Sequence, residues 1–224
     1  MRLAVLSFCC FCCFCSFFSF ALAQQGPPPF TPALMQKALG GDDTAEQALG
    51  DDYFHGIGVA ESRTASAHWY GLSAANGNPA SAYSLGVLYE KHWVPGAKAG
   101  DLAAACRWFS KSATAGYVPA FAPLGDCYRR GDMSRDAKSN YINAVLWYSK
   151  GSQERDPLAE LELGDMYYRG TGVARDRQQA IRLYGKAAKA GNSSAQSKYK
   201  MLHHPNTPYG SELPAPEAPG QSVE

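Results

Sequence analysis

A short pattern that returns four times along the chain constrains the fold more than any other feature of the sequence. Each copy has a Leu-Gly pair followed by a Tyr four residues after the Leu, and the pairs begin at Leu49, Leu85, Leu124 and Leu163. A unit of 36 to 39 residues is one supersecondary element that buries its apolar face only by stacking on its neighbours. The sequence therefore predicts a solenoid.

Each unit is predicted to contain two helices. In the first half of the first unit, Ala45, Leu49 and Tyr53 recur every four residues and share one helical face. In its second half, Trp69 and Tyr70 begin a similar stripe. The Gly after each Leu costs about 1 kcal/mol inside a helix, so its recurrence indicates that a neighbouring helix approaches closely there.

The complete pattern resembles the Sel-like repeat (SLR) family, a relative of the tetratricopeptide repeat. The fourth unit shows it most fully, with Leu163-Gly164, Gly170, Gly172-Val173, Asp176, Ala180, Lys186-Ala187-Ala188 and Gly191-Asn192. The resemblance covers residues 44–202. It implies an all-α, right-handed solenoid of four SLR helix pairs with a single capping helix at each end, about ten helices in all.

The other units depart from this pattern at a few positions. Arg155 replaces the Gly that ends the second helix of the other units, and His92 disturbs the second turn. Pro123 is expected to shorten or kink its helix, because proline removes a backbone donor and clashes with the preceding turn.

The chain divides into consecutive segments. We expect a signal peptide at 1–23, a linker at 24–31, an N-terminal capping helix at 32–43, repeats at 44–78, 79–117, 118–156 and 157–192, a C-terminal capping helix at 193–202 and a disordered Pro-rich tail at 203–224. The caps are expected because terminal repeats of a stacked array need a cover. The tail composition cannot form a core.

The first 23 residues are typical of an export signal. Arg2 supplies a positive start, an almost wholly apolar run follows, and Ala21-Leu22-Ala23 presents small residues where a signal peptidase cuts. An uncleaved membrane anchor is the alternative, because the apolar run approaches the ~20 residues that span a bilayer. We expect cleavage and a periplasmic or secreted protein.

Charge and motifs exclude several functional classes. The chain has 21 Lys plus Arg and 20 Asp plus Glu, so removal of Arg2 leaves equal numbers and no field for nucleic acid. We found no metal cluster, Walker loop or nucleophile motif in the sequence. We therefore expect no enzymatic activity, no cofactor and no metal, and no stable membrane span after signal cleavage.

Two cysteines remain after the signal peptide, since five of the seven lie within it. In Cys-rich exported SLR relatives, pairing links the two helices of one repeat. Cys106 and Cys127 belong to successive repeats and do not meet that pattern. We expect two reduced, semi-buried thiols, with a single disulfide as the alternative.

A binding surface is expected on the first helix of each repeat, at positions that point away from the core stripe. The resemblance places these helices on the concave side of the solenoid. The candidate partner-binding residues are Asp51, Phe54, Tyr83, Val87, Asp126, Arg129, Asp165 and Tyr168. Their three aspartates share one register and would form an acidic row, whereas helix curvature could instead bury some of the apolar members.

The sequence therefore predicts an exported protein-binding scaffold or adaptor. It would hold a protein or extended peptide on the concave face, as SLR relatives commonly do, with regulation or inhibition of that partner as a narrower version. The alternative is an envelope enzyme or small-ligand binder that acts on cell-wall-like or β-lactam-like molecules, for which the resemblance offers precedent among exported relatives.

Overall fold

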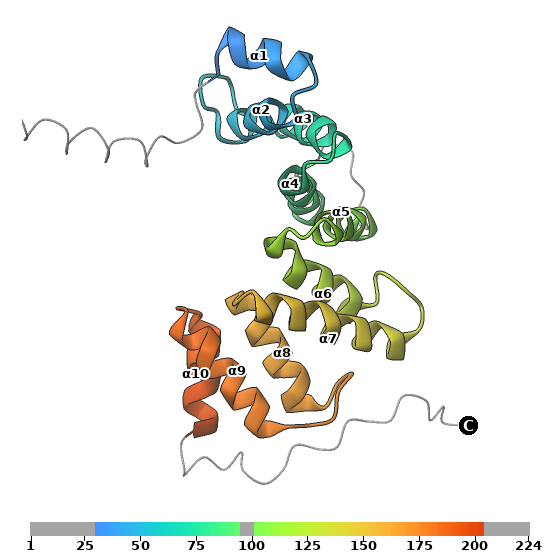
Figure 1. Cartoon of the computed structure of the whole chain (residues 1–224), viewed down its shortest axis with the longest axis vertical. Helices are drawn as coiled ribbons and strands as arrows, with labels where there is room; N and C mark the ends of the chain where they lie inside the picture. Colours follow the sequence, from blue (N-terminus) through green and yellow to red (C-terminus); the bar gives the residue numbers. More distant parts are fainter. Residues whose placement is uncertain (1–29, 95–100, 204–224) are drawn as a thin grey trace, which may run out of the picture.

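The computed structural model describes residues 30–94 and 101–203, and within these ranges all regular secondary structure is helical. It contains α1 (Pro32–Leu39), α2 (Asp43–His55), α3 (Arg63–Ala75), α4 (Pro79–Glu90), α5 (Leu102–Thr114), a 3-10 turn η1 (Val118–Ala120), α6 (Phe121–Arg130), α7 (Ala137–Gln153), α8 (Pro157–Arg169), α9 (Arg177–Lys189) and α10 (Ser193–His203). The helices stack in chain order from α1 to α10 (Figure 1). This confirms the predicted all-α solenoid.

Some expectations lie outside these residues. The signal peptide, residues 24–29 of the linker and residues 204–224 of the tail are not among the described ranges. Within the part that is described, none of the helices combines the length and apolar character needed to cross a bilayer.

Polar side chains and prolines set where the helices begin. The Asp42 carboxylate accepts hydrogen bonds from the backbone N–H groups of Thr44 and Ala45, at 3.1 and 3.0 Å, which satisfies two donors that the first turn leaves unpaired. Pro79 and Pro157 occupy the first positions of α4 and α8, where a missing N–H costs nothing.

The third repeat begins differently because of a second proline. Pro123 lies in the first turn of α6, and the segment before it forms η1 instead of continuing the α-helix. Proline cannot donate to the carbonyl four residues earlier, which is that of Pro119. The predicted shortening is thus confirmed: α6 is 10 residues long, against 13 for α2 and α8.

The glycine after each Leu makes room for an aromatic ring. A Cβ built on Gly50 would lie 2.5 Å from the ring of Tyr70, which comes from the second helix of the same repeat. A Cβ built on the equivalent glycine of each other repeat would also lie too close to a ring: 2.7 Å for Gly86 and Phe109, 2.5 Å for Gly125 and Tyr148, and 2.7 Å for Gly164 and Tyr184. The close approach predicted from the glycines therefore occurs, and it is made by a ring within each repeat.

The core is a series of clusters along the stack. One cluster joins the second and third repeats around Phe109, Phe121 and Leu124, and another joins the third and fourth around Tyr148 and Leu163. Both of these clusters draw side chains from both helices of one repeat and the first helix of the next. Stability therefore depends on contacts between neighbouring units, as in other repeat arrays.

Candidate functional site

The outward positions of α2, α4, α6 and α8 form one surface, which we call the first-helix face. Figure 1 shows α2 and α4 on the same side of the stack, with α3 and α5 on the other. Of the eight candidate binding residues, Arg129 is exposed and the other seven are half-buried. Most of these side chains are therefore partly covered by the protein itself.

The three aspartates of the predicted acidic row each accept a hydrogen bond from a tyrosine. Tyr70 donates to Asp51 at 2.5 Å, Tyr148 to Asp126 at 2.7 Å, and Tyr184 to Asp165 at 2.6 Å. In every case the tyrosine is the one whose ring passes the glycine before the aspartate. The three carboxylates therefore serve the fold, because each one joins the two helices of its own repeat.

Burial raises the pKa of all three tyrosines, and the neighbouring aspartate raises it further. Their hydroxyl groups therefore remain protonated donors. In the second repeat both partners change together: Val87 stands at the aspartate position and Phe109 at the tyrosine position. The paired change keeps the ring while removing both polar groups.

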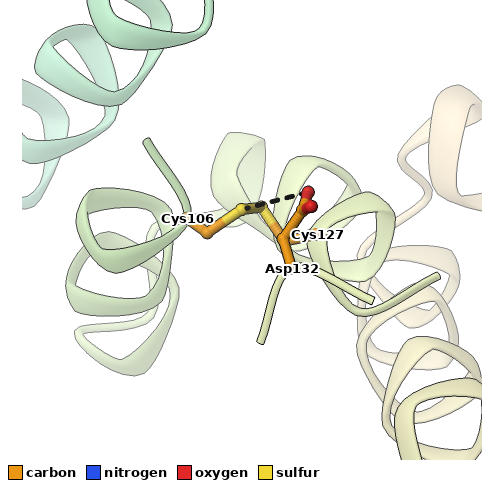
Figure 2. A group of neighbouring side chains, drawn as sticks. All are labelled: Cys106, Cys127 and Asp132. Atoms are coloured by element: carbon orange, nitrogen blue, oxygen red, sulfur yellow. Dashed lines mark hydrogen bonds between the residues drawn. A yellow bond between two sulfur atoms is a disulfide. The ribbon is translucent and has the colours of Figure 1, made fainter. Parts of the chain in front are cut away.

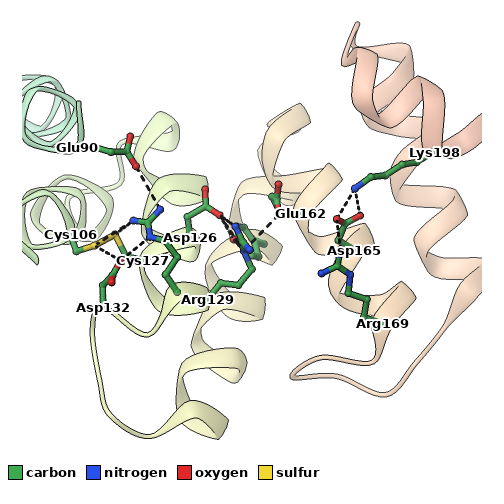
Figure 3. A network of polar contacts seen from close by, with 12 residues as sticks. Glu90, Cys106, Asp126, Cys127, Arg129, Asp132, Glu162, Asp165, Arg169 and Lys198 are labelled. Carbon is green, nitrogen blue, oxygen red and sulfur yellow. Dashed lines mark hydrogen bonds and ion pairs between the residues drawn. A yellow bond between two sulfur atoms is a disulfide. The ribbon is translucent and has the colours of Figure 1, made fainter. Parts of the chain in front are cut away.

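The first-helix face of repeats 3 and 4 is charged. Arg129 lies 2.8 Å from the Asp126 carboxylate and 3.8 Å from that of Glu162, so it connects α6 with α8. Lys198 of α10 lies 2.6 Å from Asp165. Figure 3 shows these groups arranged across α6, α8 and α10. Burial, followed by the charge of Asp126, raises the pKa of Glu162.

The first-helix face of repeats 1 and 2 is aromatic. The Arg63 guanidinium lies 3.9 Å from the centroid of the Phe54 ring and 5.1 Å from that of the Trp93 ring. Tyr83 packs instead against Phe109, with ring centroids 5.8 Å apart. Phe54 therefore belongs to a different cluster from Tyr83, and the structure does not bring these two candidates into one site.

Val87 and Tyr168 complete the candidate set. Val87 packs against the same cluster as Tyr83, which limits its availability to a partner. Tyr168 lines a hollow beside Asp165, and the Arg175 guanidinium lies 5.9 Å from its ring centroid. Tyr168 and Arg129 are thus the large candidate side chains that border open space.

Three hollows border the charged half of the face. The first, about 330 Å³, is lined by Asp165, Tyr168, Arg169, Tyr184, Lys198, Met201 and Leu202. The second, about 350 Å³, is lined by Arg129, Tyr141, Glu162, Asp165, Met166, Arg169 and Thr171. The third, about 320 Å³, is lined by Arg129, Arg130, Gly131, Ser134, Arg135, Ala137, Asn140 and Tyr141. Consecutive hollows share lining residues, so they follow one another along the surface.

The expectation of two reduced thiols is wrong, because Cys106 and Cys127 form a disulfide (Figure 2). Their Cα atoms are 5.7 Å apart, within the range that a disulfide spans. Cys106 lies on α5 and Cys127 on α6, so the bond joins the second repeat to the third. Pairing within a repeat was the wrong comparison, since the second helix of one unit packs directly on the first helix of the next.

The disulfide has charged neighbours. The Arg130 Nη2 atom lies 3.6 Å from Cys127 Sγ and 3.9 Å from Cys106 Sγ, and an Asp132 carboxylate oxygen lies 3.8 Å from Cys106 Sγ. The sulfurs carry no hydrogen, so the Asp132 approach is a contact and not a hydrogen bond. A metal site here would need free thiolates, which the disulfide removes.

Sequence reasoning missed Glu162 and Lys198, which both lie one position before the Leu register. That position was assigned to neither the core nor the outward set. The structure shows that it meets the aspartate register of the preceding repeat: Glu162 lies near Asp126 through Arg129, and Lys198 contacts Asp165 directly. Comparing the first helix of each repeat with the first helix of the next unit along the stack would have revealed both residues.

The family assignment follows from matches along most of the repeat region. The Sel1 repeat model matches residues 44–78, 79–117, 124–156 and 157–192. The chain belongs to the Sel1 repeat family. Together with the helical architecture, these matches confirm the resemblance that the sequence pattern indicated.

Similar solved structures contain the same repeats. A Sel1 repeat protein from Oxalobacter formigenes is 32% identical with a TM-score of 0.63, and the match covers 75% of this chain and 48% of that one. A protective antigen of uropathogenic Escherichia coli strains with an SLR fold is 27% identical, with a TM-score of 0.48 and coverage of 74% and 42%. This Sel1 repeat protein thus spans less than half the length of either structure. Among curated proteins, none matches it.

Proposed function

We propose that this Sel1 repeat protein is an exported scaffold that holds a protein or extended peptide on its first-helix face. Sel1 repeat proteins commonly bind other proteins and are generally not enzymes. The observation that supports a binding role most strongly is the run of hollows along repeats 3 and 4, bordered by Arg129, Arg169 and Tyr168. A regulatory or inhibitory effect on the partner is the narrower form of this proposal.

The charged half of the face is suited to recognition because its side chains are already held in place. Arg129 is fixed by Asp126, by Glu162 and by the Tyr148 hydroxyl 3.2 Å away, yet its side chain remains 41% exposed. A pre-positioned arginine loses little side-chain entropy on binding. Arginine and tyrosine are also the residues in which binding energy most often concentrates.

The same geometry argues against a catalytic role for the tyrosines. The tyrosines that contact carboxylates on this face have a raised pKa, and deprotonation would be needed to make them nucleophiles or bases. The Tyr–Asp pairs act as internal hydrogen bonds between the two helices of a repeat. The proposal therefore favours binding over the alternative of an envelope enzyme for cell-wall-like or β-lactam-like molecules.

Export is part of the proposal. The signal-like composition of residues 1–23 supports it, and so does the Cys106–Cys127 disulfide, because such bonds persist in oxidising compartments outside the cytosol. Intact mass of the protein recovered from its native compartment tests this part. A chain that begins at Gln24 is expected, whereas a chain that retains Met1 and needs detergent for extraction would contradict it.

A comparative capture experiment tests the binding role. The wild-type protein and a double Arg129→Ala/Tyr168→Ala variant would be used as baits in the native envelope fraction, with quantitative mass spectrometry of bound proteins. A matched control is Arg107→Ala/Arg182→Ala, which removes two exposed arginines from the second helices α5 and α9.

The expected result is a protein that binds the wild type and the control but is depleted on the first-helix variant. Loss of one or two binding residues is worth about 1–3 kcal/mol each, which is roughly a 5- to 150-fold change in affinity. A partner that the α5/α9 control loses and the first-helix variant keeps would show that the binding face is on the second helices.

A further inference from the structure

Acidic and basic side chains are separated between the two kinds of helix in this array. The second helices of the repeats, α3, α5, α7 and α9, contain no Asp or Glu. They contain nine cations: Arg63, Arg107, Lys111, Lys138, Lys150, Arg177, Arg182, Lys186 and Lys189. The near balance of charge over the whole chain therefore hides an uneven distribution.

The acids that flank these helices do not cancel their charge. Five acids lie just outside the helix bounds: Glu61, Asp101, Asp136, Glu154 and Asp176. Nine cations against five acids leave four positive charges. The first helices with their flanking residues, 42–56, 79–91, 121–132 and 156–170, carry twelve acids and four cations, which leaves eight negative charges. The first-helix face is thus acidic overall, and the outward positions of α3, α5, α7 and α9, which we call the second-helix face, are basic.

Most of the second-helix cations are exposed and form no ion pair. Seven of the nine are exposed: Arg107, Lys111, Lys138, Lys150, Arg182, Lys186 and Lys189. Within the described ranges, Arg63 is the one member of the nine that forms an ion pair, with Glu61 at 2.9 Å. By contrast, Arg129 and Arg130 of α6 both lie within ion-pair distance of carboxylates. The charge of the second-helix face is therefore available to an anionic ligand.

Three of these lysines share one register. Lys111, Lys150 and Lys186 lie on α5, α7 and α9 at equivalent positions of their repeats. Lys186 also opposes the rise that burial causes in the pKa of Glu160, but Glu160 is only 3% exposed, so the lysine is the charge that a ligand would meet. The three hollows described above include none of these lysines. A row spread over three repeats suits an extended anionic surface better than a single small anion.

Exposed aliphatic side chains lie among the cations. Ile142 and Leu146 are one turn apart on α7, and each is 50% exposed. Leu146 shares its register with Arg107 of α5 and Arg182 of α9, so the same position is basic in the repeats before and after it. Lys and Arg interspersed with large apolar side chains are typical of protein surfaces that rest on a lipid headgroup layer.

We propose that the second-helix face docks on a bilayer that contains anionic phospholipids. The Lys and Arg head groups would contact lipid phosphates, and Ile142 and Leu146 would enter the headgroup region. The same bilayer would repel the acidic first-helix face, which would therefore point away from it, open to the partner of the proposed function. An acidic protein could also meet the cations, but it would leave the two aliphatic side chains without a role.

Vesicle flotation tests the proposal without any partner. The chain used lacks residues 1–23, because their apolar run would itself enter a bilayer. Vesicles of phosphatidylglycerol and phosphatidylcholine in equal parts should carry the protein to the top of the gradient, whereas vesicles of phosphatidylcholine alone should not. Binding should fall at least about tenfold near 1 M salt, where the Debye length is about 3 Å.

Matched substitutions locate the contact. Lys150→Gln/Lys186→Gln should weaken binding to the anionic vesicles about 25-fold, since each basic residue near such a surface contributes about fivefold. Lys37→Gln/Lys91→Gln removes two exposed lysines, one from α1 and one just after α4, and should change binding less than about twofold. Leu146→Gln should weaken binding severalfold and keep the preference for anionic lipid. Circular dichroism checks that each variant retains the wild-type helix content.

Absence of binding to the anionic vesicles at low salt, or equal losses in the two lysine pairs, would overturn this inference. So would a protein from the envelope fraction that Lys150→Gln/Lys186→Gln fails to capture while vesicles stay unbound, because the face would then recognise an acidic protein. The proposed function is decided separately, by capture of a partner through Arg129 and Tyr168, so either proposal can fail without the other.

Discussion

Repeats 2 and 4 place an aromatic ring against the same glycine register, but they complete the contact in different ways. In repeat 4, Tyr184 donates a hydrogen bond of 2.6 Å to Asp165. In repeat 2, Phe109 is completely buried, and Val87 stands at the sequence position of the carboxylate. The ring and the glycine are therefore common to both, and the hydroxyl–carboxylate pair is an addition that a repeat can do without.

The two repeats also differ in how they attach to the next unit of the stack. Repeat 2 is linked to repeat 3 by the Cys106–Cys127 bond, whereas repeat 4 is linked to the capping helix α10 by the ion pair of Lys198 with Asp165. One junction is covalent and buried. The ion pair at the other junction is half-exposed and lies beside a buried apolar contact made by Ala195 and Leu202, so the contribution of the ion pair alone should depend on salt.

The largest expected effect is the loss of the ring in either repeat. Phe109→Ala and Tyr184→Ala should each lower the free energy of unfolding by about 3–5 kcal/mol, because each leaves a cavity in a buried cluster. Urea unfolding followed by circular dichroism measures both. Tyr184→Phe is the control and should cost about 1 kcal/mol, since Asp165 keeps its contact with Lys198. A Tyr184→Phe cost as large as that of Tyr184→Ala would mean that the hydroxyl is essential.

The next effect concerns the two junctions. Replacing both Cys106 and Cys127 by Ala should cost about 3 kcal/mol on the loop-entropy model for this 21-residue separation. Lys198→Met, at the other junction, should cost less than about 1 kcal/mol, as is usual for a half-exposed ion pair. Unfolding measured with and without reductant checks the first value, and reductant should not change the double variant.

A third prediction concerns Asp52, which shares its register with Leu88 of repeat 2 and Met166 of repeat 4. Asp52 is fully buried and neither carboxylate oxygen has a hydrogen-bond partner. Asp52→Met should therefore raise the free energy of unfolding at pH 7 by about 1–3 kcal/mol. A destabilised variant would show that the carboxylate has a favourable role.

The pH dependence separates charge from packing in this prediction. Burial raises the pKa of Asp52, and the charge of Asp51 raises it further. The folded state therefore holds the proton more tightly than the unfolded chain, so wild-type stability falls as pH rises from about 4 through the raised pKa. The advantage of Asp52→Met should be smaller at pH 4 than at pH 7.

Much of the fold could be predicted because the register repeats four times. A helix was expected before the first repeat, within residues 32–43, and α1 (Pro32–Leu39) lies there, followed by Asp42 as the N-cap of α2. A pattern of this kind specifies which side chains of one helix share a face. The outward register of Phe54, Tyr83 and Tyr168 stays a prediction: all three side chains are half-buried, and Tyr83 packs against Phe109.

Contacts between different helices were harder to predict. The Tyr–Asp pairs join helices about twenty residues apart, and the paired change to Phe109 and Val87 was the signal that could have revealed them. The disulfide was missed for a related reason: its cysteines lie in different repeats that become neighbours only when the array stacks. Periodicity within a helix predicts which side chains share its buried face. Predicting which side chains of two different helices meet also requires knowing how the helices align when they pack.

The smallest expected effect concerns the end of the second helix in each repeat. Gly77, Gly116 and Gly191 adopt positive φ there, and Arg155 does so in repeat 3 with φ of 61°. A side chain in this left-handed region costs about 1 kcal/mol or slightly more. Arg155→Gly should therefore raise the free energy of unfolding, although greater freedom of the unfolded chain offsets part of the gain.

Gly191→Ala is the matched reverse: its Cβ would meet no atom within 4 Å, so its cost of about 1 kcal/mol would report backbone strain alone. Opposite signs in urea unfolding would show that repeat 3 carries a strain that repeat 4 avoids. A destabilising Arg155→Gly would mean that the arginine side chain makes a contact that outweighs it.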